Sequence, residues 1–251
     1  MAEKRPADAP RLLLLSSSRT TVTAFLEHAA DSIRKFLGTT VKEVTLVPFA
    51  AVNWTCDDMA ERATAAFGAL GYGISSLHAA ADADRAAREA EAFAVAGGNT
   101  FQLLREMQVR GLLQTVRARV LAGAPYVGWS AGSNLACPTI RTTNDMPIVW
   151  PVSAEALGLV PFQINPHFTD THAPDHQGET REERLQEFMR LNPRVTVVGL
   201  REGSALRIEG GRIELIGSAK LRLFRGGEIW EAAPGDSLEF LLEGGPFPIS
   251  I

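Results

Sequence analysis

Residues 125–134 read PYVGWSAGSN, and their pattern indicates the fold class. A short apolar run at 125–128 leads straight into a Gly-x-Ser-x-Gly turn centred on Ser130, and helix-compatible residues follow. A serine in such a turn sits on a sharp strand-to-helix connection with its hydroxyl exposed. The flanking glycines let the backbone turn without a Cβ clash. The stretch predicts an α/β fold with Ser130 as a candidate nucleophile; the alternative interpretation is a purely structural turn.

The same alternation of strand and helix extends on both sides of this turn. Apolar runs at 12–15, 44–49, 72–77 and 92–96 are typical of strands buried on both faces. Between and after them, the patterns at 21–36, 57–70, 79–90 and 100–121 predict helices, the last one capped by Asn99. Alternating strands and helices form right-handed crossovers. We therefore expect a mostly parallel sheet flanked by helices.

Beyond residue 200 the pattern changes to hairpins. The runs 205–209 and 212–216 flank a Gly-Gly turn, and 221–224 and 228–230 repeat the arrangement. We expect a β-rich C-terminal end attached to the same domain. Residues 1–10 are predicted to be a disordered N-terminal extension, and residues 11–251 a single α/β domain.

Composition excludes several classes of protein. The chain has 251 residues with 25 Lys and Arg against 29 Asp and Glu, and a formal net charge of −4 argues against a general nucleic-acid binder. Cys56 and Cys137 are too few for a disulfide scaffold, so we expect reduced thiols. No apolar run near the N-terminus suits a signal peptide or a membrane span, and we expect a cytoplasmic protein.

A catalytic serine needs a base, normally a histidine, and an acid that orients the base. His167 follows an apolar run and is expected near the carboxyl end of a strand, where open α/β sheets place their ligands. It is therefore the best candidate for the base. Asp145 lies in a polar turn and Glu202 follows the apolar run 195–200; both are candidates for the acid, and spacing does not choose between them.

Backbone N–H groups of Gly98 and Ala131 are candidates for an oxyanion hole, although Gly-Gly would serve a tight turn equally well. His172 and His176 are four residues apart, but Pro174 would break the helix that brings such a pair together. We therefore expect a polar loop there and no metal.

Three other cationic or titratable residues have simple interpretations. His28, in a helical pattern, and His78, at a strand end, are read as surface or satisfied core residues. Arg181 follows Thr180, which has the spacing to Glu183 of a capping box, so it is predicted in the first turn of a helix. It is either a solvated arginine offset by neighbouring glutamates or a group that binds a carboxylate.

Five motifs occur in one order along the chain: GGNT at 97–100, GWSAGSN at 128–134, TTNDMP at 142–147, QINPHF at 163–168 and GETRE at 178–182. Together they resemble serine peptidase family S51, the peptidase E family of aspartyl dipeptidases. The likeness runs from the first strand to about Gly217, which is most of the chain.

The resemblance implies a fold like that of class I glutamine amidotransferases (flavodoxin-like), and hydrolysis of dipeptides with an N-terminal aspartate without metal or cofactor. It implies that Ser130 is the nucleophile and His167 the base. Asp145 matches the aspartate assigned to the charge relay, and Glu202 matches a glutamate with a claim to the same role. Arg181 matches the arginine that binds the aspartyl side chain of the substrate.

Two alternatives remain open from the residues. One is a cyanophycinase-like enzyme or another serine hydrolase. The other is a non-catalytic small-molecule binding module on the same fold. The expected partner is a small aspartyl dipeptide, with no nucleic acid and no membrane, and the protein is expected to be a monomer or a homodimer.

Overall fold

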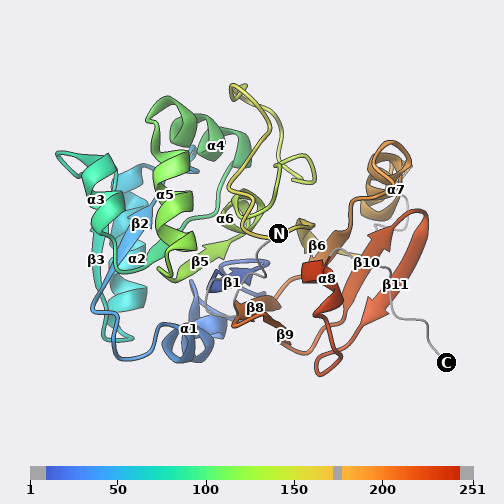
Figure 1. Cartoon of the computed structure of the whole chain (residues 1–251), viewed down its shortest axis with the longest axis horizontal. Helices are drawn as coiled ribbons and strands as arrows, with labels where there is room; N and C mark the ends of the chain where they lie inside the picture. Colours follow the sequence, from blue (N-terminus) through green and yellow to red (C-terminus); the bar gives the residue numbers. More distant parts are fainter. Residues whose placement is uncertain (1–9, 172–176, 244–251) are drawn as a thin grey trace, which may run out of the picture.

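The apolar run 12–15 forms strand β1 (Leu12–Leu15) inside a seven-stranded sheet (Figure 1). The computed structural model describes residues 10–171 and 177–243. The strand order in the sheet is β3-β2-β4-β5-β1-β8-β9; the first five strands are parallel, and β8 and β9 are antiparallel additions. The other strands are β2 (Glu43–Val47), β3 (Gly73–Ser76), β4 (Phe93–Val95), β5 (Tyr126–Trp129), β8 (Ala205–Glu209) and β9 (Arg212–Ile216).

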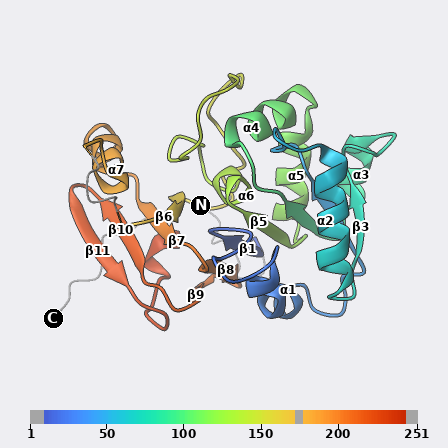
Figure 2. The same ribbon diagram turned by 180° about the vertical axis from the view of Figure 1, so that it is seen from behind.

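Helices cover both faces of this sheet (Figures 1 and 2). Alternate residues of β1 face opposite sides, so Leu12 and Leu14 belong to one buried cluster and Leu13 and Leu15 to another. The first cluster contains side chains of α3 (Ala83–Glu89), α4 (Thr100–Val109), α5 (Leu112–Leu121) and α6 (Ala131–Leu135). The second contains those of the short η2 (Glu27–Ala29), α1 (Ala30–Leu37) and α2 (Cys56–Gly68). Burial on both faces explains why β1, β4 and β5 are continuously apolar. The expectation of full burial is wrong for β3, which lies at the edge of the sheet and is only partly buried.

A second, four-stranded sheet has the order β11-β10-β7-β6. Its strands are β6 (Gln163–Phe168), β7 (Val197–Arg201), β10 (Leu221–Arg225) and β11 (Glu228–Ala232). β6 and β7 are parallel, whereas β10 pairs antiparallel with β7 and β11. α7 (Arg181–Leu191) packs on this sheet through a small apolar cluster, and α8 (Phe240–Glu243) follows β11 (Figure 1).

Most predicted elements are confirmed, including the two C-terminal hairpins and the Asn99 cap, which accepts the N–H of Gln102. The predicted helix at 21–36 is wrong in its first part: the helical segment begins only at Glu27, and 19–26 is a loop with Leu26 at a positive φ of 57°. The hairpins also separate, one joining each sheet.

Three regions lie outside the described residues: 1–9, 172–176 and 244–251. The predicted N-terminal extension and the pair His172 and His176 fall almost wholly within them. The division into one extension and one domain stays a prediction. Within the described part of the chain, no helix combines the length and apolarity needed to cross a bilayer.

Candidate active site

Ser130 lies on the sharp turn between β5 and α6, as the sequence predicts. Its φ is 53°, a left-handed value that is uncommon for a residue with a Cβ. Two glycines allow close backbone approach around Ser130: Gly132 in this turn, and Gly98 in the neighbouring turn between β4 and α4. A Cβ on Gly132 would lie 2.1 Å from the carbonyl oxygen of Val95, and one on Gly98 would lie 2.1 Å from that of Ala50.

His167 lies near the end of β6, in the second sheet, and its Nε2 is 2.9 Å from Oγ of Ser130. Its Nδ1 is 2.7 Å from Oε1 of Glu202, which directly follows β7. His167 also has a positive φ of 53°. The hydroxyl of Ser130, the imidazole of His167 and the carboxylate of Glu202 are thus hydrogen-bonded in series, each near the end of a strand. We call these three residues the series. Strained backbone at two of these three residues is consistent with a functional site.

Asp145 lies at the start of α4 and not against the imidazole. Its Oδ2 accepts hydrogen bonds from the backbone N–H of Thr100 at 2.7 Å, the hydroxyl of Thr100 at 2.6 Å and the hydroxyl of Thr143 at 3.1 Å. Among the described residues, Glu202 is the carboxylate within hydrogen-bond distance of His167. Of the two candidates for the acid, Asp145 therefore makes no direct contact with the imidazole in the described structure.

The series borders a pocket of about 740 Å³. Gly98, Asp145 and Arg181 also line it. Ala131, the other oxyanion candidate, directly follows Ser130 as the first residue of α6, where helix N–H groups have no carbonyl partner within the helix. The five motifs therefore converge on one cavity, although they span more than eighty residues of sequence.

Arg181 is the first residue of α7 and lies between Thr180 and Glu183, which form the predicted capping box. Its Nη1 is shielded from solvent and has no hydrogen-bond partner in the described structure. Burial lowers the pKa of Arg181, and Arg184 adds to that effect, while Asp145 and Glu202 oppose it. A half-buried guanidinium with an unpaired nitrogen is a costly arrangement that a bound carboxylate would relieve.

The neighbouring glutamates have other partners. Glu182 contacts Arg222, Glu179 lies 3.6 Å from Arg184, and Glu183 accepts the N–H of Thr180. The interpretation of Arg181 as a solvated arginine offset by these glutamates is therefore not favoured.

Other titratable residues lie apart from the series. Both cysteines are free, and burial raises the pKa of the Cys137 thiol to about 12, which leaves it protonated at neutral pH. His78 contacts Ser76 and Asp57. His28, interpreted as a surface or satisfied core residue, is only partly exposed; neither ring nitrogen has a partner in the described part of the chain, and burial lowers its pKa.

The sequence does not predict two features of the site. Ser16 is fully buried, and its Oγ accepts the N–H of His167 and donates to the carbonyl of Leu200. Phe25 and Trp54, from separate loops, line the pocket. The triple serine at 16–18, directly after a buried strand, is the only sequence signal for the first feature, and none marks the second.

A serine, a histidine and a carboxylate hydrogen-bonded in series, with the serine on a strand-to-helix nucleophile turn, define a serine hydrolase. The model of peptidase family S51 matches residues 12–216. A Peptidase E from a Nostoc species is 48% identical over 238 residues, covering 94% of this chain and 98% of its own length. A Peptidase E from Citrobacter koseri is 47% identical, covering 89% and 96%.

A solved structure has the same fold. The crystal structure of a peptidase from an acI-B1 actinobacterium superimposes with a TM-score of 0.66 at 15% sequence identity and covers 93% of this chain and 98% of its own. The chain belongs to peptidase family S51, and it is a serine peptidase.

Proposed function

We propose that the protein is a dipeptidase that cleaves dipeptides with an N-terminal aspartate. The observation that carries the proposal is the half-buried Arg181, whose Nη1 lacks a partner within the described structure and which lines the same pocket as Ser130 and His167. A guanidinium can hold the aspartyl carboxylate with two parallel hydrogen bonds. Arg181 also lies at the N-terminus of α7, where the helix dipole presents positive charge that would attract the same carboxylate.

In the proposed reaction, Oγ of Ser130 attacks the peptide carbonyl carbon while Nε2 of His167 takes the hydroxyl proton. Backbone N–H groups of Gly98 and Ala131 stabilise the resulting oxyanion. His167 then gives its proton to the leaving amine, and the C–N bond breaks. Water, deprotonated by His167, attacks the aspartyl ester and releases aspartate. Glu202 orients the imidazole and stabilises its charged form.

The proposed chemistry uses no metal or cofactor, since the covalent intermediate and the proton transfers involve only side chains and water. From the sequence alone, we propose that the protein is cytoplasmic and that it is a monomer or a homodimer.

A dipeptide panel tests the proposal, with EDTA present in one series. Asp-Leu should be hydrolysed far faster than Asn-Leu or Glu-Leu, because a neutral amide leaves Arg181 unpaired and a longer side chain displaces the scissile carbonyl. Arg181→Met should cost about 2–5 kcal/mol in kcat/KM for Asp-Leu and little for residual Asn-Leu cleavage. Equal losses on both substrates would mean that Arg181 supports the fold. Preferred cleavage of cyanophycin or of a p-nitrophenyl ester would replace the proposed substrate class.

A further inference from the structure

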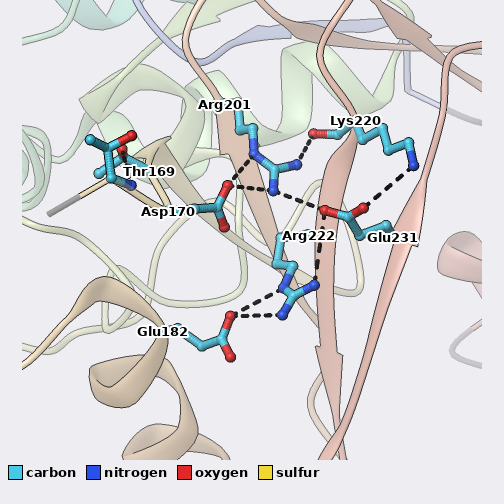
Figure 3. Close-up of polar contacts among 8 residues, drawn as sticks. Thr169, Asp170, Glu182, Arg201, Lys220, Arg222 and Glu231 are labelled. Carbon is cyan, nitrogen blue, oxygen red and sulfur yellow. Dashed lines mark hydrogen bonds and ion pairs between the residues drawn. The ribbon is translucent and has the colours of Figure 1, made fainter.

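The hairpin β10–β11 lies beyond residue 216, where the match to the family model ends. It nevertheless contacts the elements that carry the site. Figure 3 shows a network of charged side chains that runs from α7 across β10 and β11 to β7. We call it the hairpin network; its members are Asp170, Glu182, Arg201, Lys220, Arg222 and Glu231.

One end of the network holds the first turn of α7. Nε and Nη2 of Arg222 donate to Oε2 of Glu182 at 3.1 and 3.0 Å. Glu182 directly follows Arg181 in the sequence. Both partners are less than one-third exposed, so solvent screens the contact only in part. Arg222 also lies opposite Glu231 in the β10–β11 ladder, which holds the arginine over the sheet (Figure 3).

The other end holds the residues next to His167 and Glu202. Arg201, which precedes Glu202, donates from Nε and Nη2 to Oδ2 of Asp170 at 2.8 and 2.6 Å. Its Nη2 also lies 3.0 Å from Oε1 of Glu231, and its Nη1 donates to the carbonyl of Lys220 (Figure 3). Burial acts to lower the pKa of Arg201, but these carboxylates raise it overall, so the guanidinium stays charged.

An apolar contact connects the hairpin to the same point. The ring of Phe168, the residue after His167, lies 5.8 Å from that of Phe224 on β10 and 5.6 Å from the guanidinium carbon of Arg201. Gly199 gives the ring its space, because a Cβ there would lie 2.8 Å from it. The strand that carries His167 is thus fixed by packing as well as by charge.

We propose that the hairpin network positions the substrate-binding and catalytic groups: Arg222 fixes Arg181 through Glu182, and Arg201 fixes the His167 and Glu202 strand ends through Asp170 and Glu231. Arg222 and Arg201 are positioning residues that touch no substrate. The inference rests on the proposed function. Partly exposed ion pairs add little to the stability of a fold, but small displacements of a substrate-binding group reduce activity strongly.

The test compares Arg222→Met, Glu182→Gln and the double variant on Asp-Leu and Asn-Leu. Each single change should raise KM for Asp-Leu by about 10-fold or more, with a smaller effect on kcat, and should reduce the preference for Asp-Leu over Asn-Leu. The double variant should be no worse than the worse single variant, since both changes remove one contact. Arg222→Lys, which keeps the charge but not the fork, should lie between Met and wild type.

The matched control is Arg85→Met, which removes the exposed pair with Glu89 on α3, on the seven-stranded sheet. It should change neither KM nor selectivity. Thermal unfolding of every variant shows whether the fold is intact; if Arg222→Met does not fold, the near-isosteric Glu182→Gln decides.

Different outcomes would exclude the proposed function and the positioning role of the hairpin network. If the wild-type protein does not cleave Asp-Leu, the proposed function is wrong and the inference falls with it. If the wild-type protein cleaves Asp-Leu but Arg222→Met and Glu182→Gln keep its KM and its selectivity, the inference alone is wrong. Additive losses in the double variant would also overturn it, because they would mean that the two residues act separately.

Discussion

The hydroxyl of Ser16 accepts a hydrogen bond from the backbone N–H of His167, 2.8 Å away. Ser16 directly follows β1 in the seven-stranded sheet, and His167 belongs to β6 in the four-stranded sheet. The same hydroxyl donates to the carbonyl of Leu200 in β7, at 2.7 Å. The side chain of Ser16 therefore holds both β6 and β7 against the seven-stranded sheet, which carries Ser130.

Ser16→Ala should lower both activity and stability. The change leaves the buried N–H of His167 and the carbonyl of Leu200 without their partner, at a cost of about 1–3 kcal/mol in the free energy of unfolding. kcat should fall because the imidazole loses its backbone anchor. Chemical denaturation and Asp-Leu kinetics measure the two effects. Ser75→Ala, on β3 at the far edge of the sheet, is the control and should leave kcat unchanged. Wild-type kcat in Ser16→Ala would contradict the anchoring role.

Glu202 and Asp145 should differ in what their amide variants lose. Glu202→Gln should lower kcat by about 10³- to 10⁴-fold with little change in KM, because an amide neither orients nor stabilises the imidazolium in the same way. Asp145→Asn should mainly reduce stability, by about 1 kcal/mol, because it weakens a cap on α4. Steady-state kinetics and thermal unfolding of both variants distinguish the roles. A larger loss of kcat in Asp145→Asn than in Glu202→Gln would reverse the assignment.

Ser130 can be tested both as a nucleophile and as a residue with a positive φ. Ser130→Ala and Ser130→Gly should both lower kcat by at least about 10³-fold, the scale of losing a covalent nucleophile. Since glycine adopts a positive φ without strain, Ser130→Gly should be the more stable of the two. Differential scanning calorimetry compares them directly. Near-normal kcat in either variant would exclude the nucleophile, and equal stability would exclude backbone strain at this turn.

His28 should make the stability of the protein depend on pH. Because burial lowers its pKa from the ordinary value of 6.5, the unfolded chain binds a proton at a higher pH than the folded protein does. Above pH 6.5 the ring is mostly neutral in both states, so His28 adds little pH dependence to the free energy of unfolding. Below it the unfolded chain gains the proton first, and stability decreases as pH falls. His28→Leu should show a smaller loss of Tm than wild type between about pH 7.5 and about pH 5. An identical loss in both proteins would contradict the expectation.

The sequence predicts the parts of this molecule that depend on local periodicity. β1, β2, β5 and the helices between them follow from short apolar runs and caps, because strands buried on both faces must be apolar throughout. The loop at 19–26 was missed because its residues are compatible with a helix, whereas its conformation is set by contacts such as that of the backbone N–H of Leu26 with the carbonyl of Ser18. Hydrogen bonding within the loop overrides weak helix propensity there.

The candidate site was predictable in its members but not in its connections. Ser130 and His167 were identified by their places at strand ends. Asp145 lies in a polar turn and Glu202 follows an apolar run, and neither setting by itself marks the acid that orients a histidine. Their difference arises from the side-by-side pairing of β6 and β7, which brings position 202 to the imidazole, and from the helix end that takes Asp145. No local pattern encodes that choice.

The division of the series between two sheets has a consequence for when this enzyme can act. Ser130 precedes Glu202 by 72 residues, and a ribosome releases the chain from its N-terminus. A nascent chain whose seven-stranded sheet has begun to form holds Ser130 without His167, its proposed base. Chemistry becomes possible only after β7 has emerged and joined β6. The proposed active site is therefore incomplete until about four-fifths of the chain has been synthesised, because Glu202 belongs to a 251-residue sequence.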